Sequence, residues 1–116
     1  MEKMQLTINE KSQELVFGVE ALEFLDNKYK MEQGGMELGM SIAYVLTNFA
    51  TGNVSMLSDL IEAGTRVNKP KPTRKEINEY IVSLDLDDLE KLYDDIYENF
   101  TAQPVVALQM KRLNQA

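Results

Sequence analysis

The sequence predicts a mainly helical α+β domain in which an N-terminal β-hairpin packs on about five helices, the last two forming an αα-hairpin. Apolar residues alternate with polar ones near the N-terminus, recur at helical spacing from residue 19 onward, and are interrupted by glycines and prolines between segments. With 116 residues, of which 44% are hydrophobic, the chain is long enough to bury one small core without disulfides or metals.

Residues 3–17 are predicted to form the β-hairpin around a turn at residues 9–12. The apolar residues that alternate on its two strands are Leu6, Ile8, Leu15 and Phe17. A two-stranded hairpin is only marginally stable alone in water, so we expect this apolar face to lie against helices.

Helices are predicted wherever the apolar residues share one helical face. These segments are residues 19–30, 36–49, 54–63, 74–84 and 86–100. The second is apolar around most of its circumference, which indicates a central helix surrounded by the others. The last is the most clearly amphipathic, and its Leu89, Tyr93 and Ile96 are expected in the core.

Local signals mark where the later helices begin. Asn53 and Asp85 are predicted N-caps, and Thr73 with Glu76 fits a capping box, in which each side chain accepts a hydrogen bond from the other residue's backbone. The prolines within residues 66–72 predict an exposed connector before this box.

No helical phase is visible among the apolar residues after Pro104. We therefore predict one globular domain over residues 1–100, followed by a flexible tail over residues 101–116.

Charge is unevenly distributed along the chain, which has a net charge of −7. Residues 66–75 hold five bases and no acid, whereas residues 76–100 hold nine acids and one lysine. The acidic balance argues against binding to nucleic acid. The basic segment is interpreted as a solvated linker, with attraction to acidic faces of neighbouring copies, and hence self-association, left open.

The residues that most catalytic sites use are missing. There is no cysteine and no histidine, and no glycine-rich phosphate-binding motif occurs. The acids of residues 85–90 lack the glycine and spacing of a calcium loop, so they are interpreted as a solvated helix start. No catalytic residue, metal site or cofactor is therefore predicted.

No targeting or membrane segment is expected either. The first twenty residues carry several glutamates, and the longest nearly apolar run, residues 38–46, is far shorter than a bilayer requires. These features predict no membrane partner and a cytoplasmic location.

The layout of hairpin, helices and acidic helix resembles that of a known protein family. The segments that carry the resemblance are the hairpin from Leu6-Thr-Ile-Asn-Glu to Leu15-Val-Phe-Gly, the helix Leu22-Glu-Phe-Leu-Asp-Asn-Lys-Tyr and the acidic Asp87-Asp-Leu-Glu-Lys-Leu-Tyr-Asp-Asp-Ile. The chain is similar over about residues 4–100 to tail assembly chaperones of long-tailed bacteriophages that infect Gram-positive bacteria.

This resemblance implies a non-enzymatic protein that binds the phage tape measure protein and keeps it soluble while the tail tube assembles around it. It also implies a location in the host cell cytoplasm, absence from the mature virion, and a longer frameshifted form in some relatives that recruits tail tube protein.

Candidate partner-binding residues are chosen on physical grounds, since methionine and aromatic side chains suit adaptable apolar contacts. They are Phe24, Met56, Tyr93, Tyr97 and Phe100. The alternative for the last three is a place in the core.

Two other functions fit parts of the sequence. An acidic inhibitor could mimic DNA, although a mimic needs a long continuous acidic surface and here the acids share each helix with apolar residues. A structural tail-completion protein is the third alternative, and it would be found in purified virions.

Overall fold

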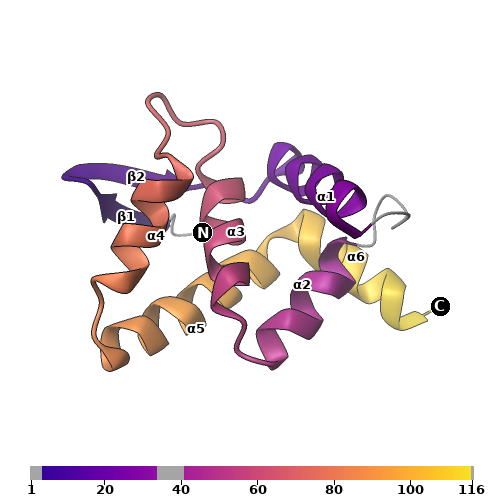
Figure 1. Cartoon of the computed structure of the whole chain (residues 1–116). Coiled ribbons are helices and arrows are strands. Elements are labelled where there is room, and N and C mark those ends of the chain that lie inside the picture. The colour runs from indigo at the N-terminus through magenta and orange to yellow at the C-terminus, as the bar shows by residue number, and fades with distance from the viewer. Residues whose placement is uncertain (1–3, 34–40, 116) are drawn as a thin grey trace.

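A computed structural model of the chain describes residues 4–33 and 41–115 (Figure 1). The described residues form a two-stranded antiparallel sheet followed by six helices, which confirms the mainly helical α+β class. The elements are β1 (Met4–Ile8), β2 (Lys11–Leu15), α1 (Val19–Gln33), α2 (Ser41–Ala50), α3 (Val54–Gly64), α4 (Arg74–Val82), α5 (Leu86–Ala102) and α6 (Pro104–Gln115).

The hairpin is closed by a two-residue turn at Asn9 and Glu10, with Ile8 paired to Lys11. Both turn residues have positive φ values, 53° and 65°, which match the type I′ turns favoured by twisted hairpins. The predicted apolar face is confirmed, because the four side chains named for it are all buried: Leu6, Ile8, Leu15 and Phe17.

The hairpin packs directly against the C-terminal end of α3. The Val16 amide donates to the Gly64 carbonyl at 2.8 Å. A Cβ atom at Gly64 would lie only 2.9 Å from Phe17 Cε1 and 3.0 Å from Leu15 Cδ2. A side chain at this position would therefore force the buried side chains of Phe17 and Leu15 to shift.

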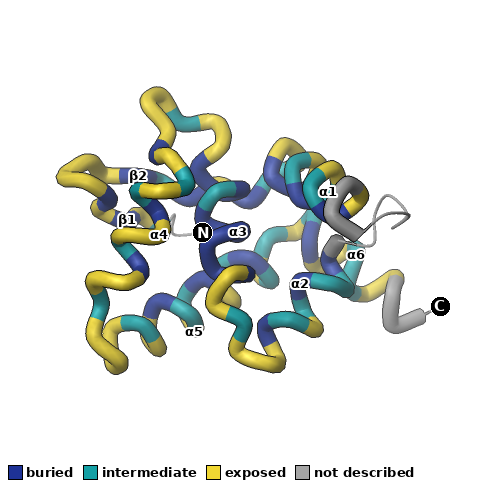
Figure 2. The backbone as a smooth tube through the Cα atoms, in the orientation of Figure 1, coloured by how far each residue is buried: buried dark blue, intermediate teal, exposed yellow. Residues whose placement is uncertain are grey.

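The central helix is α3, and the prediction that residues 36–49 fill this place was wrong. Eight of the eleven residues of α3 are buried, and Figure 2 shows it enclosed by the other elements. Within the described part of the predicted segment, α2 buries Ile42 and Val45 but leaves Thr47 exposed. Residues 36–40 of that prediction lie outside the described residues.

Burial of α3 on all sides depends on partners for its polar residues. Asp59 accepts hydrogen bonds from Tyr29 Oη at 2.9 Å and from Arg74 Nη1 at 2.7 Å, which joins α3 to α1 and α4. Arg74 also donates to Glu62 at 3.0 Å. Burial is the largest single influence on the pKa of the Arg74 guanidinium and lowers it, but the hydrogen bonds and negative charges of Asp59 and Glu62 together outweigh burial and raise that pKa.

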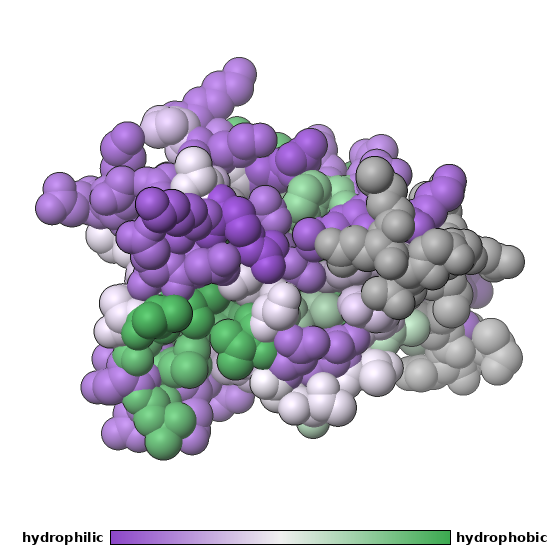
Figure 3. Space-filling view, viewed as in Figure 1, coloured by the Kyte–Doolittle hydropathy of each residue, from purple (hydrophilic) through white to green (hydrophobic). Residues whose placement is uncertain are grey.

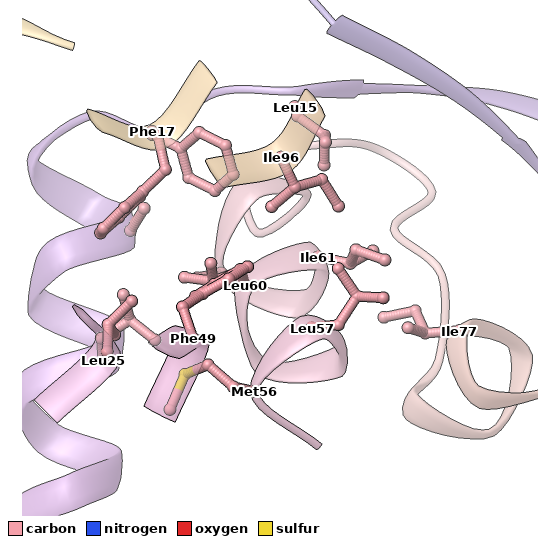
Figure 4. Close-up of a cluster of buried hydrophobic side chains, with 14 of the residues drawn as sticks. Leu15, Phe17, Leu25, Phe49, Met56, Leu57, Leu60, Ile61, Ile77 and Ile96 are labelled. Carbon is pink, nitrogen blue, oxygen red and sulfur yellow. The ribbon is translucent and has the colours of Figure 1, made fainter. Parts of the chain in front are cut away.

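The core surrounds α3 and receives side chains from both strands and all six helices of the described chain. Figure 4 shows this cluster. Leu57, Leu60 and Ile61 of α3 lie between Phe17 and Ile96 on one side and Ile77 on another. Of the three α5 residues expected in the core, Ile96 is fully buried, while Leu89 and Tyr93 are half-buried.

All three predicted helix starts are confirmed. The side chains of Asn53 and Asp85 accept from backbone amides at the starts of α3 and α5. Thr73 and Glu76 form the reciprocal capping box of α4. The hydrogen bond from the Thr73 amide, followed by one from Asn9, lowers the pKa of the Glu76 carboxyl.

The flexible tail predicted for residues 101–116 is contradicted by α6. This helix contacts α2 and α5, and Val106 is fully buried. Pro104 begins the helix, a position where its missing amide costs nothing, and Gln103 before it is extended, as residues preceding proline usually are. The sequence interpretation failed because it relied on the missing helical phase of the apolar residues after Pro104, whereas α6 is held by its contacts with α2 and α5.

Candidate functional site

Two of the predicted partner-binding residues lie inside the protein. Met56 is 2% exposed, with its sulfur 3.1 Å from Tyr29 Oη, and Phe100 is 0% exposed. Phe100 meets Phe17 edge to face, with ring centroids 5.3 Å apart. Neither side chain can reach a partner in this conformation, so both stabilise the fold.

A third predicted residue, Phe24, is half-buried on α1. The guanidinium of Arg66 lies over its ring, 4.8 Å from the centroid. This cation–π contact holds the beginning of residues 66–75, which we call the basic connector, on α1. Phe24 is therefore only partly accessible at the surface, and Arg66 of the connector lies over its ring.

The other two predicted residues, Tyr93 and Tyr97, both contact the ring of Phe49. The ring centroid of Tyr93 is 4.5 Å from that of Phe49, and the centroid of Tyr97 is 5.4 Å from it. Tyr93 Oη also donates to the Phe49 carbonyl at 3.0 Å, and partial burial raises the pKa of its phenol. Tyr97 is 38% exposed, so this aromatic cluster of α2 and α5 reaches the surface.

A groove continues from Tyr93 toward the start of α5, with a volume of about 290 Å³. We call it the α5 groove, and it is lined by Gly52, Val54, Leu86, Leu89, Glu90, Tyr93 and Asp94. Leu86 is 70% exposed and Val54 46%. Figure 3 shows apolar side chains gathered on the surface where α4 leads into α5.

The sequence did not single out Val54 and Leu86 as surface residues, because each falls on the same helical face as core residues. They differ from those residues in position along the helix. Val54 begins α3 and Leu86 begins α5, so the first turn of each helix extends beyond the core. Helical phase alone gives no signal for this difference.

The basic connector is largely occupied by contacts within the fold. Arg66 lies on Phe24, and Arg74 pairs with Asp59 and Glu62. Asn68 donates to the Gln13 side chain and to the Glu14 carbonyl, which holds the connector against β2. Only the lysines remain as exposed cations without these roles, at positions 69, 71 and 75.

The described residues contain neither a metal-binding cluster nor a membrane-spanning helix. No group of three or more carboxylates is placed to hold a metal ion. Within residues 4–33 and 41–115, no helix combines the length and the apolar composition that crossing a membrane needs.

Comparison with protein families gives a match over nearly the whole chain. The family model described as phage tail assembly chaperone protein, TAC, matches residues 5–115. The chain belongs to the phage tail assembly chaperone family. The match confirms the resemblance seen in the hairpin and acidic helix, and it extends through α6. Searches of curated proteins and of solved structures gave no match.

Membership of the tail assembly chaperone family changes how the exposed apolar residues are interpreted. Monomeric soluble proteins rarely leave contiguous apolar surface without a function. In a chaperone, such a surface is available for a client. The α5 groove and the aromatic cluster beside it are therefore the candidate functional site, and Tyr93 belongs to both.

Proposed function

We propose that this protein is a non-enzymatic chaperone that binds the phage tape measure protein and keeps it soluble while the tail tube assembles. It acts in the host cell cytoplasm and is absent from the mature virion. The observation that supports this most directly is an exposed apolar groove on a member of the tail assembly chaperone family. The acidic net charge of −7 would help keep a bound apolar client in solution.

The proposed interaction gains most of its free energy from burial of apolar surface. The groove offers Val54, Leu86 and Leu89, backed by the Tyr93 ring. Burial of such side chains is worth about 25 cal/mol for each Å² removed from water. Because this contribution is insensitive to ionic strength, the complex should survive moderate salt.

Tail tube protein is proposed as a second, indirect partner. A longer frameshifted form of the chaperone would recruit it through an added C-terminal extension. The last described helix, α6, ends at Gln115 (Figure 1).

Co-expression tests the proposed function. The tagged protein should retain the tape measure protein of its own phage in the soluble fraction, at about 0.15 M and at about 0.5 M salt. Expression of the tape measure protein alone is the control, and it should be largely insoluble. Failure to recover any tape measure protein at either salt concentration would refute the proposal.

Purified phage particles test the location. Mass spectrometry should find the tape measure protein in mature virions and no peptide of this chain. A stoichiometric amount of the chain in virions would instead support a structural tail-completion protein.

A further inference from the structure

Two parallel rows of side chains run along the exposed face of α5. The apolar row consists of Leu86, Leu89, Tyr93 and Tyr97, at spacings of three, four and four residues. The acid row consists of Asp87, Glu90, Asp94 and Glu98, at the same spacings and one position later. Residues at these spacings share a helix face, so the acid row follows one edge of the apolar row.

The stability of α5 alone does not account for the acid row. Asp87 lies in the first turn, where the helix dipole favours an acid, but Asp94 and Glu98 lie in later turns, where it does not. Glu90, Asp94 and Glu98 are also separated by four residues each, so neighbouring like charges repel. All members of the row are exposed, and among the described residues none forms an ion pair.

The only base on α5 does not relieve this repulsion. Lys91 donates to Asp95 at 2.8 Å, and this hydrogen bond raises the pKa of the lysine. The last turn of α5 carries no base either. The acid row thus keeps its negative potential beside an apolar surface, an arrangement that fits a partner with bases beside its own apolar residues.

We infer that the α5 groove binds an amphipathic helix of the client whose apolar stripe is bordered on one side by lysine or arginine. This inference rests on the proposed function and names the segment of the tape measure protein that the groove selects. The apolar stripe would pack on the apolar row and Val54, and the bases would pair with the acid row. From Leu86 to Tyr97 the rows extend about 16 Å, enough for about three turns of the bound helix.

A second copy of this chain fits the groove less well. Five of the twelve bases of the chain lie within residues 66–75, where Arg66 and Arg74 are already engaged. None of the described helices carries a row of bases over three turns beside an apolar stripe. Charge therefore favours a different chain as the occupant.

Matched substitutions in the full chain test the inference. Leu86→Ser removes an exposed leucine from the apolar row, and Leu108→Ser removes a comparably exposed leucine from α6. Asp94→Lys reverses a charge of the acid row, and Glu23→Lys reverses an exposed charge on α1. All four sites are outside the core, and thermal unfolding of each variant verifies that it folds.

Affinity is measured by fluorescence anisotropy with labelled peptides that tile the tape measure protein of the same phage. A peptide with an apolar stripe and a basic border should bind the wild-type chain. Leu86→Ser and Asp94→Lys should each weaken it about tenfold, whereas Leu108→Ser and Glu23→Lys should leave it within about twofold. The effect of Asp94→Lys should shrink at high salt, because it is electrostatic.

A charge swap separates a direct contact from an indirect effect. Replacing the bases of that peptide by glutamate should abolish binding to the wild-type chain and partly restore it to Asp94→Lys. Equal affinity of all four variants for every binding peptide would overturn the inference and leave the proposed function intact. Loss of a dimer in Leu86→Ser, measured by light scattering, would assign the groove to a second copy and also overturn it.

Failure of the proposed function has a different signature. In that case wild-type protein would not keep the tape measure protein soluble in co-expression, and no tiled peptide would bind. A client retained by the wild type and lost with Leu86→Ser but not Leu108→Ser would support both.

Discussion

The two ends of α3 differ in how completely they are covered. At its C-terminal end Gly64 lies against Leu15 and Phe17, and the Val16 amide is hydrogen-bonded to its carbonyl. At its N-terminal end Val54 is nearly half exposed and faces the open α5 groove. One end of α3 therefore lies in a tightly packed interface, and the other end borders an exposed apolar surface. The first end maintains the fold, and the second is available to a client.

Phe100→Ala is expected to have the largest effect on stability, because it removes a ring from the tightly packed core. The ring is fully buried against Phe17, so its removal should lower the free energy of unfolding by about 3 to 5 kcal/mol. Urea denaturation measures this change. Tyr97→Ala is the matched control on the open side, since Tyr97 is partly exposed, and it should cost about 1 kcal/mol or less. Similar losses for the two variants would contradict the assignment of Phe100 to the core.

Arg74→Met tests the polar contacts that allow α3 to be buried. The substitution leaves the Asp59 carboxylate buried with Tyr29 as its main hydrogen-bond donor. We expect a loss of about 2 to 3 kcal/mol, less than for a fully buried pair because Arg74 is partly exposed. Lys75→Met, at the exposed neighbour, should change the unfolding midpoint little. An Arg74→Met variant as stable as the wild type would show that the ion pair contributes nothing to the fold.

Leu89→Ala distinguishes the groove from the core along α5 itself. From its helical phase alone Leu89 was expected in the core, and full burial would make this substitution cost about 2 to 5 kcal/mol. The side chain is only half-buried in the wall of the groove, so we expect about 1 to 2 kcal/mol. Ile96→Ala, on the buried face of the same helix, should cost more. Equal costs would mean that the groove is closed in solution.

The sequence was sufficient for the elements whose signals are local. Alternation of Leu6, Ile8, Leu15 and Phe17 predicted the hairpin face, and side-chain caps predicted the starts of α3, α4 and α5. These signals depend on neighbours within a few residues. They require no knowledge of how the helices are arranged in space.

Features that depend on tertiary arrangement were not predictable in this way. The burial of α3 requires Tyr29 and Arg74 to reach Asp59 from α1 and α4, and nothing near Asp59 in the sequence indicates this. For the same reason Met56 was expected at a surface. The exposure of Leu86 depends on where α5 leaves the core, which helical phase does not specify.

The capping box of α4 provides a pH-dependent test of a contact that stabilises the fold. The hydrogen bond from the Thr73 amide lowers the folded-state pKa of Glu76, so its stabilising contribution is present above the unfolded-state pKa and is lost as the pH falls through the folded-state value. Unfolding of the wild type and of Glu76→Gln should therefore differ near neutral pH and converge in acid. Glu79→Gln is the matched control, because Glu79 lies on the same helix outside the capping box.

Asp94→Asn has the smallest expected effect, and it should change the stability of the free protein and the binding of the client in opposite directions. Asp94→Asn removes like-charge repulsion with Glu90 and Glu98, so the free protein should become slightly more stable, by about 0.2 to 0.5 kcal/mol for each repulsive pair. The same substitution should weaken the client complex, because it removes a charge from the acid row. Thermal unfolding at low salt measures the first effect, and co-purification with the tape measure protein measures the second. A residue retained for the fold would show the two changes in the same direction. A gain in stability together with weaker client binding would mean that the acid row is maintained for its partner at a cost to the helix that carries it.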